Sequence, residues 1–266
     1  MTHPKKVLVT GGTSGIGLAI AQRFARDGHD LVLIGSNPTR DYGSAVREVR
    51  VAAEEVGCQP NVMAHGVDIT DFAAVKKLLA HVHDEVGTFD VLVHSAGVFF
   101  DTPITDETPD AFVRMMNVNV NGMWHIVQAA LPYMRRKMGQ TSGGKIVAIS
   151  SISGFYGFAN YSGYSASKAA VTSLTRSLAL ELGPLGININ AVEPGRVKTS
   201  MHDALLSDPA QENVLREIAA SNPSGRAFTT PEDIANVVAF LASEGAIAMH
   251  GASLVVDEGT TLGIVS

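Results

Sequence analysis

The chain alternates short apolar runs with longer stretches in which apolar residues recur every three or four positions. The runs are mostly continuous series of Val, Ile and Leu. Continuous runs are typical of strands buried on both faces, as in a parallel sheet covered by helices. We therefore expect seven strands, at Lys6–Thr10, Leu31–Gly35, Val62–Val67, Val91–Ser95, Lys145–Ser150, Asn188–Val192 and Ser253–Val256.

The longer stretches carry their apolar residues at helical spacing. Asp71 fits the N-cap of one helix, and Thr230 fits the cap of another whose first position is Pro231. Strand–helix alternation with right-handed crossovers predicts an α/β fold, a Rossmann-type doubly wound parallel sheet with helices on both faces. The expected helices are Ile16–Asp27, Tyr42–Val56, Phe72–Val86, Asn117–Lys137, Gly163–Leu182 and Pro231–Ala242.

The least regular stretch is Met201–Pro223, which is acidic, Ala-rich and helix-prone. It leaves the sixth strand, and ligands in such folds bind at the carboxyl ends of the strands. We expect a segment around residues 200–224 to act as a lid over a substrate. The chain has no internal repeat or linker, so residues 1–266 are expected to form one domain.

Composition narrows the class of protein. A hydrophobic content of 45% and a charged content of 17% predict a substantial core. The formal net charge of -6 argues against nucleic-acid binding. The one compact basic cluster, Arg135-Arg136-Lys137, is interpreted as a solvated helix end.

Cysteine, hydropathy and histidine add weaker constraints. Cys58 is the only cysteine, which fits a reducing compartment. We find neither a signal peptide nor an apolar stretch long enough to span a bilayer, and we expect a soluble cytoplasmic protein without membrane contact. His81 and His83 point to different faces of a helix, and no metal site is expected.

The first chemical motif is a glycine-rich turn, Thr10-Gly11-Gly12-Thr13-Ser14-Gly15-Ile16-Gly17, directly after the first apolar run. Gly11 permits a tight strand exit, Gly15 lets backbone N–H groups approach a pyrophosphate, and Gly17 lets the helix pack closely on the strand. The helix N-terminus supplies partial positive charge for phosphates. In isolation the turn fits an ordinary strand-to-helix loop equally well.

The second motif is Tyr164-Ser165-Ala166-Ser167-Lys168. Tyr164 and Lys168 are four residues apart on a predicted helix and share a face. A tyrosine pKa near 10 is too high for good base catalysis at neutral pH, and a neighbouring cation lowers that pKa. The alternative for the pair alone is an accidental match on an exposed helix face.

Together, in this order and in a chain of this length, the two motifs resemble the short-chain dehydrogenase/reductase family. The turn matches the family pattern Thr-Gly-x-x-x-Gly-x-Gly, and Ser151 precedes Tyr164 by 13 residues, an interval that also matches. The resemblance spans almost the whole chain. It implies an oxidoreductase that transfers a hydride between a nicotinamide cofactor and a ketone or secondary alcohol.

The resemblance implies four catalytic residues. Tyr164 would be the proton donor and acceptor, Ser151 would steady the developing alkoxide, and Lys168 would also bind the nicotinamide ribose. Asn119 would hold a water that links Lys168 to solvent. Two alternatives stay open: Ser150 or Ser153 could be mistaken for Ser151, and asparagines near position 119 could be structural caps.

The resemblance also implies the cofactor contacts. Asp68 and the Ile69 backbone would meet the adenine ring, unless Asp68 caps a helix in competition with Asp71. His94-Ser95-Ala96-Gly97 departs from the family's Asn-Asn-Ala-Gly, which puts its strand-stabilising hydrogen bonds in doubt, and Glu258 replaces a family glycine, which we expect to alter packing. The implied contacts are Gly11, Thr13, Ser14, Gly15, Ile16, Gly17, Asp68, Ile69, Ser95, Ala96, Gly97, Tyr164, Lys168, Pro194, Gly195, Val197 and Thr199.

The end of the second strand bears on the choice between NAD and NADP. A carboxylate there would hold the ribose 2′-OH of NAD and repel a 2′-phosphate, but the chain has none at this point. Ser36 and Asn37 offer hydrogen bonds and Arg40 offers charge, although Arg40 fits a solvated residue equally well. NADP(H) is favoured, and NAD(H) is not excluded.

Aromatic residues are expected around the substrate. They suggest an apolar or ring-bearing small-molecule ketone or alcohol, although several could merely pack under the lid. We find no arginine clamp that commits the substrate to a charge. The expected substrate contacts are Ser151, Ser153, Phe99, Phe155, Tyr156, Tyr161 and Tyr164, with Val98 and Phe158 bordering the pocket.

Two further functions stay open. One is a 3-oxoacyl-thioester reductase whose basic cluster at Arg135 meets an acidic carrier protein. The other is a nucleotide-sensing scaffold without turnover. By resemblance we expect a homo-oligomer, a tetramer or dimer formed through Asn117–Lys137 and Gly163–Leu182.

Overall fold

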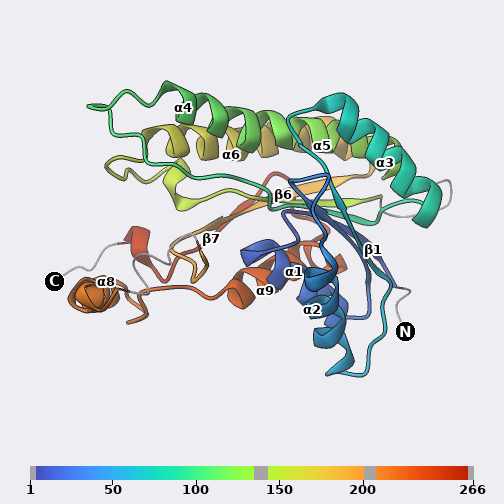
Figure 1. The fold of residues 1–266 in the computed structure, drawn as a ribbon, viewed down its shortest axis with the longest axis horizontal. Helices are drawn as coiled ribbons and strands as arrows, with labels where there is room; N and C mark the ends of the chain where they lie inside the picture. The colour runs from blue at the N-terminus through green and yellow to red at the C-terminus, as the bar shows by residue number, and fades with distance from the viewer. Residues whose placement is uncertain (1–3, 135–142, 201–207, 263–266) are drawn as a thin grey trace.

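The computed structural model describes residues 4–134, 143–200 and 208–262. Seven parallel strands form one sheet between two layers of helices (Figure 1), in the order β3-β2-β1-β4-β5-β6-β7. This confirms the predicted Rossmann-type fold. The strands are β1 Lys6–Thr10, β2 Asp30–Gly35, β3 Val62–Gly66, β4 Val91–His94, β5 Lys145–Ile149, β6 Asn188–Pro194 and β7 Ser253–Val256.

Each face of the sheet has its own hydrophobic core. Val7 and Val9 of β1 pack on one side and Leu8 on the other, all three with 0% exposure. Burial on both faces is the reason for the continuous apolar runs. One face carries α1 Gly15–Arg26, α2 Gly43–Glu54 and α9 Pro231–Leu241, and the other carries α3 Phe72–Val86, α5 Gly122–Ala130 and α6 Ser162–Leu182 (Figure 1).

Two helix starts follow the predicted capping. Asp71 Oδ1 accepts a hydrogen bond from the Ala74 N–H at 3.0 Å, and Thr230 forms a reciprocal capping box with Asp233. Asp68 is not the cap of α3. Its Oδ1 accepts from the N–H and hydroxyl of Thr70, which closes a short turn after β3.

The predicted continuous helix Asn117–Lys137 is wrong, because the described part of this region is not one α-helix. It begins within a π-helical stretch at Met116–Asn121, continues as α5 and ends in a 3₁₀ turn at Leu131–Tyr133. The sequence analysis also missed the helix that precedes the π-helical stretch, α4 Pro109–Met115. A π turn carries an extra residue and rotates the side chains that follow it. The cluster Arg135-Arg136-Lys137 lies outside the described residues.

The expected lid segment contains a helix that was not predicted as a distinct element. Residues 201–207 lie outside the described residues, and Pro209–Gln211 forms a 3₁₀ turn before α8 Glu212–Ser221. In Figure 1, α8 stands apart from both helical layers, beyond the end of the sheet near β7.

Glu258 adopts a conformation that suits the glycine it replaces. Its φ is 61°, in the left-handed region. Both carboxylate oxygens bind Arg226, at 3.0 Å to Nε and 2.9 Å to Nη2. The expected change in packing is thus an ion pair that joins the segment after α8 to the turn after β7.

Strand order reverses between β1 and β4, and this reversal positions the site. Chains leaving the carboxyl ends of these two strands turn to opposite faces and open a crevice between them. Within the described ranges, no helix is long and apolar enough to cross a membrane, and no three His, Cys, Asp or Glu side chains form a metal-binding group.

Candidate active site

A cleft opens at the carboxyl edge of the sheet and has two adjoining parts. We call the part lined by Ser151 and Tyr164 the tyrosine arm, and the part lined by Ser36 and Asp68 the aspartate arm. Their volumes are about 680 and 580 Å³, both within the usual range for ligand sites. The arms share Gly11, Ser14, Ala96, Gly97 and Val98, so they form one continuous groove.

The glycine turn lies where the arms meet and depends on backbone approach. Gly11 and Gly15 have φ values of 68° and 53°, which favour glycine. A Cβ on Gly17 would lie 2.2 Å from the Gly11 carbonyl oxygen, so α1 packs against the turn only without a side chain there. The first residues of α1 line the groove, which fits a pyrophosphate at a helix N-terminus.

Most of the predicted cofactor contacts lie in this groove. The tyrosine arm holds Gly11, Ser14, Gly15, Ile16, Gly17, Ser95, Ala96, Gly97, Tyr164, Lys168, Pro194, Gly195, Val197 and Thr199. The aspartate arm adds Thr13, Ser36, Asp68 and Ile69.

The proposed 2′-phosphate contacts are separated. Ser36 lines the aspartate arm, whereas Asn37 and Arg40 are not part of the lining. The Asn37 side chain accepts from the Thr39 N–H at 2.9 Å, and its backbone carbonyl accepts from the Tyr42 hydroxyl at 3.0 Å. The Arg40 guanidinium lies 5.8 Å from the centre of the Tyr42 ring. Two of the three predicted residues are thus engaged locally, Asn37 by hydrogen bonds within its turn and Arg40 by the Tyr42 ring.

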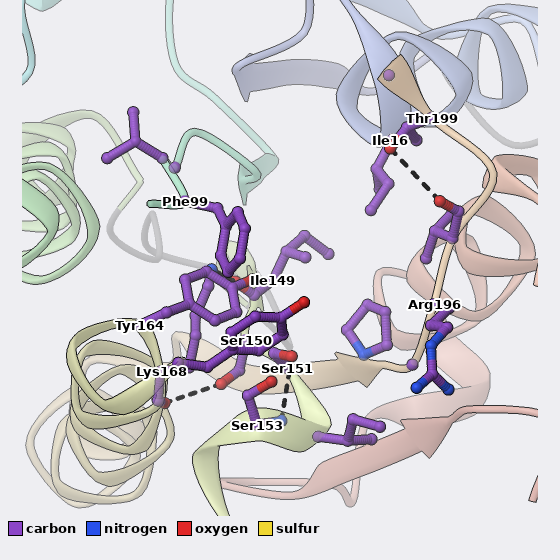
Figure 2. Close-up of a pocket in the computed structure, with 18 of the residues that line it drawn as sticks. Ile16, Phe99, Ile149, Ser150, Ser151, Ser153, Tyr164, Lys168, Arg196 and Thr199 are labelled. Carbon is purple, nitrogen blue, oxygen red and sulfur yellow. Dashed lines mark hydrogen bonds between the residues drawn. The ribbon is translucent and has the colours of Figure 1, made fainter. Parts of the chain in front are cut away.

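Three of the four predicted catalytic residues, Ser151, Tyr164 and Lys168, come together in the tyrosine arm (Figure 2), whereas Asn119 is not part of its lining. α6 carries Tyr164 and Lys168, and Ser151 follows β5 at the start of a 3₁₀ turn. Lys168 Nζ donates to the Ile149 carbonyl oxygen at 2.9 Å and lies 5.6 Å from the centre of the Tyr164 ring. Ser151 Oγ accepts from the Ser153 N–H at 3.1 Å and is hydrogen-bonded to Tyr164.

The titration of this group differs from the sequence expectation. Burial raises the pKa of Tyr164 to about 12, and the Ser151 hydrogen bond opposes that rise. Burial also lowers the pKa of Lys168 to about 8. The expected lowering of the tyrosine pKa by Lys168 is thus not found: burial has the largest effect on this pKa, and Lys168 is not among the groups that shift it. With this pKa, the Tyr164 phenol is neutral at pH 7.

Asn119 is the buried member of its asparagine-rich stretch, with 1% exposure. Its Oδ1 accepts from the Val98 N–H at 2.8 Å, and its Nδ2 donates to the Val98 carbonyl at 2.9 Å and to Ser167 Oγ at 3.0 Å. Asn117 and Asn121 instead bind each other on the exposed side. The Asn119 amide therefore joins the loop after β4 to α6, and both of its donors are engaged.

The serines near β5 have different environments. Ser150 Oγ donates to the Lys168 carbonyl at 2.9 Å and lies 2.9 Å from Thr172 Oγ1, so it is held as part of the β5–α6 packing. Ser151 and Ser153 line the tyrosine arm close to Tyr164 (Figure 2). These contacts favour Ser151 or Ser153 over Ser150 as a substrate contact.

His94 forms a hydrogen bond between neighbouring strands at the segment where the family has Asn-Asn-Ala-Gly. Its Nδ1 lies 3.0 Å from Thr10 Oγ1, which also accepts from the Ala96 N–H at 3.3 Å. The carboxyl ends of β1 and β4 are therefore joined by side chains. Burial, assisted by Lys168, lowers the pKa of His94 to about 3, so the imidazole is neutral at pH 7.

The predicted substrate residues divide into two groups. Phe99, Phe158 and Tyr161 line the tyrosine arm, and the Phe99 ring meets the Tyr164 ring edge-on at 5.1 Å. Phe155 and Tyr156 do not line it, and they are 57% and 42% exposed. They follow the 3₁₀ turn Ile152–Gly154, and their side chains face solvent there.

Sequence reasoning missed four polar residues of the tyrosine arm: Asp101, Asn160, Arg196 and Ser200. Arg196 was passed over because its segment was interpreted as a backbone contact for the cofactor. Asn160 has a φ of 68°, which a sequence pattern does not reveal.

Comparison with known proteins agrees with this geometry. A family model described as enoyl-(acyl carrier protein) reductase matches residues 11–261. The chain is 36% identical over 255 residues to L-rhamnose 1-dehydrogenase (NAD(P)(+)) of Azotobacter vinelandii, covering 96% of each chain. It is 35% identical over 259 residues to the 3-oxoacyl-[acyl-carrier-protein] reductase MabA of Mycobacterium tuberculosis, covering 97% of this chain and 94% of the relative.

A solved structure shows the same fold over nearly the whole length. The short-chain type dehydrogenase/reductase from Mycobacterium ulcerans superposes with a TM-score of 0.86 at 29% identity, covering 97% of this chain and 90% of that one. The family match, the relatives and the Ser151–Tyr164–Lys168 group in the cleft lead to one conclusion. The chain belongs to the short-chain dehydrogenase/reductase family of nicotinamide-dependent oxidoreductases.

Proposed function

We propose that this protein transfers a hydride between NADP(H) and a small-molecule ketone or secondary alcohol, with Tyr164 as proton donor and acceptor. The observation that carries the proposal is the placement of Ser151, Tyr164 and Lys168 in the arm that adjoins the glycine turn. An apolar or ring-bearing substrate fits the Phe99, Phe158 and Tyr161 side chains of that arm.

The residues divide the work of the reaction. The cofactor, when bound, supplies the hydride that reaches the carbonyl carbon. The Tyr164 hydroxyl donates a proton to the carbonyl oxygen, and its pKa of about 12 keeps that proton available at neutral pH. Ser151 Oγ donates to the same oxygen and steadies the alkoxide as it forms. Lys168 binds the nicotinamide ribose, and Asn119 fixes the loop through Val98.

The preference for NADP(H) rests on the aspartate arm. Ser36 lines that arm at the end of β2, where no carboxylate would repel a 2′-phosphate. Arg40 is engaged over Tyr42, so a side-chain movement is needed before it can contact a phosphate. NAD(H) remains the alternative, and the NAD(P)(+) in the name of the Azotobacter relative is compatible with either.

Replacing Tyr164 by Phe tests the proposal. We expect turnover of a panel of aryl and alkyl ketones with NADPH to fall by about a hundredfold or more, because the proton donor is lost. Absorbance of NADPH measures the rate, and fluorescence titration measures its binding, which should be nearly unchanged. Tyr133→Phe, at a residue that stacks on His83 outside the cleft lining, is the matched control. Substantial turnover by Tyr164→Phe would refute the assigned role.

A 3-oxoacyl-thioester reductase is the second candidate, favoured by the name of the mycobacterial relative. It predicts faster reduction of a thioester on an acyl carrier protein than of the same acyl group on a small thiol. It also predicts that added salt weakens the preference, because the carrier is acidic. A nucleotide-sensing scaffold predicts saturable cofactor binding with no turnover of any carbonyl, but such a site has no chemical reason to keep Ser151, Tyr164 and Lys168.

We further propose that the protein is a homo-oligomer, a tetramer or dimer, formed through the helical layer that contains α4, α5 and α6. Exposed apolar side chains lie on α4, α5 and α6, among them Phe112 at 44%, Trp124 at 41% and Leu180 at 82% exposure. These helices lie side by side on one face of the molecule (Figure 1). Sedimentation equilibrium of the wild type and of Leu180→Glu tests this, and a monomeric wild type would contradict it. The cytoplasmic location stays a prediction.

A further inference from the structure

Arg196 is the one arginine in the lining of the tyrosine arm, as far as the described residues extend. It lies two residues after the end of β6, and its backbone carbonyl accepts a hydrogen bond from the Thr229 N–H at 2.8 Å. The side chain is half-buried. Figure 2 shows it across the pocket from Tyr164, with Ser151 and Ser153 on the Tyr164 side. The backbone is therefore anchored while the guanidinium borders the pocket.

The guanidinium has an aromatic neighbour but no acidic one. It lies 5.9 Å from the centre of the Phe158 ring. No carboxylate of the described residues lies within 4.0 Å of it, whereas Arg23, Arg26 and Arg226 each have such a partner. An arginine stacked on an aromatic face keeps its fork of donors free for a planar anion.

We propose that Arg196 binds an anionic group of the substrate, a carboxylate, while the carbonyl that reacts lies at Tyr164 and Ser151. This inference rests on the proposed function and names its substrate class: oxo acids and the matching hydroxy acids, with an apolar or aromatic portion beside Phe158. Guanidinium binds carboxylate through two parallel hydrogen bonds, which would also fix which carbonyl of the substrate faces Tyr164.

The other polar groups of the arm are compatible with an anion. Lys168 adds a second positive charge at neutral pH, although its Nζ is engaged by Ile149. Asp101 is the one acidic residue in the described lining of this arm, and it is exposed, so water and salt screen its repulsion. A cofactor phosphate is the competing occupant, but the N-terminus of α1 and the glycine turn already offer a phosphate site.

The first test measures binding and needs no turnover. Benzoate and benzamide have the same shape and differ in charge, and their binding to the protein with NADP⁺ is compared by calorimetry. We expect benzoate to bind at least about tenfold more tightly, as for a charge-assisted hydrogen bond, and Arg196→Gln to remove the difference. Arg26→Gln, which loses the same charge in a pair with Glu55 outside the lining of the arm, should keep it. Equal binding of the two probes to the wild type would overturn the proposal.

The second test measures turnover with pyruvate, acetoacetate and levulinate, each against its methyl ester. These acids differ in the distance between ketone and carboxylate. For at least one of them we expect kcat/KM for the acid to exceed that for its ester. Arg196→Gln should reduce the acid-to-ester ratio of kcat/KM by about tenfold, because kcat/KM falls for the acid and not for the ester. An equal loss for acids and esters, or weaker NADPH binding, would assign Arg196 to the cofactor and overturn the proposal. If no carbonyl is turned over but benzoate still binds through Arg196, the proposed reaction fails and the anion site stands. If Arg196→Gln does not fold, equal binding of benzoate and benzamide to the wild type still overturns the proposal.

Discussion

The glycine turn and the tyrosine arm adjoin in one groove but are built from different parts of the chain. The turn works through backbone: Gly11 and Gly15 have left-handed φ values, and Gly17 packs directly on the Gly11 carbonyl. The tyrosine arm works through the side chains of Ser151 and Tyr164. A backbone site requires that side chains be absent, so any added atom damages it. A side-chain site can lose its chemistry and keep its shape.

The largest effect is expected from Gly17→Ala, which should disrupt the backbone site and weaken cofactor binding. The new Cβ would lie 2.2 Å from the Gly11 carbonyl oxygen, so the turn has to move. We expect the binding free energy of NADPH to become less favourable by about 3 kcal/mol, which is a loss of about a hundredfold in affinity. Fluorescence titration measures the affinity, and thermal unfolding shows whether the variant is folded. Gly183→Ala adds a Cβ with nothing within 4 Å and is the control. An unchanged affinity in Gly17→Ala would show that the turn is not the binding site.

The second prediction concerns the side-chain arm and pH. Alcohol oxidation needs the tyrosinate, and the Tyr164 pKa of about 12 makes that form scarce at neutral pH. Between pH 7 and pH 8, before Lys168 has lost most of its charge, we expect kcat/KM for oxidation to rise about tenfold and ketone reduction to stay nearly level. Initial rates in both directions, in buffers of constant ionic strength, check this. A plateau in oxidation below pH 8 would mean that Tyr164 titrates much lower than its burial implies.

The third prediction places a charge in the aspartate arm. Ser36→Asp should shift the ratio of NADPH to NADH affinity by about tenfold toward NADH, because a carboxylate at the end of β2 repels a 2′-phosphate. Ser44→Asp introduces the same charge on the exposed side of α2 and should leave the ratio alone. If both variants change the ratio equally, the effect is long-range electrostatics, and Ser36 is not the contact.

The smallest expected effect concerns His94, which joins the two strands at the reversal. An unfolded histidine has a pKa near 6.5, whereas burial lowers the pKa of His94 to about 3. The unfolded chain therefore binds the extra proton first, and stability is lost as pH falls from 6.5 toward 3. The loss should be on the order of 1 kcal/mol per pH unit. Urea unfolding at pH 7 and pH 5 should show less acid sensitivity in His94→Asn, and equal sensitivity would contradict this.

Fixed spacing explains what could be predicted from the sequence. Tyr164 and Lys168 are one helical turn apart, and Ser151 leaves an adjacent buried strand, so local periodicity and sheet order bring them together. The direction of Arg196 was not predictable, because it depends on how the chain leaves β6 and on the Thr229 contact. The π-helical stretch around Asn119 was missed for a similar reason. Asn119, inside this stretch, is hydrogen-bonded to the Val98 backbone, and such a tertiary contact has no signal in the local pattern.

The most direct measurement is a fluorescence titration of the wild type, Tyr164→Phe and Gly17→Ala with NADPH, with ketone turnover measured on the same samples. We predict saturable binding to the wild type, nearly equal affinity with turnover lost in Tyr164→Phe, and greatly weakened binding in Gly17→Ala. That result would show a backbone site for the cofactor and a side-chain site for the chemistry. No saturable binding of NADPH or NADH to the wild type would contradict both assignments.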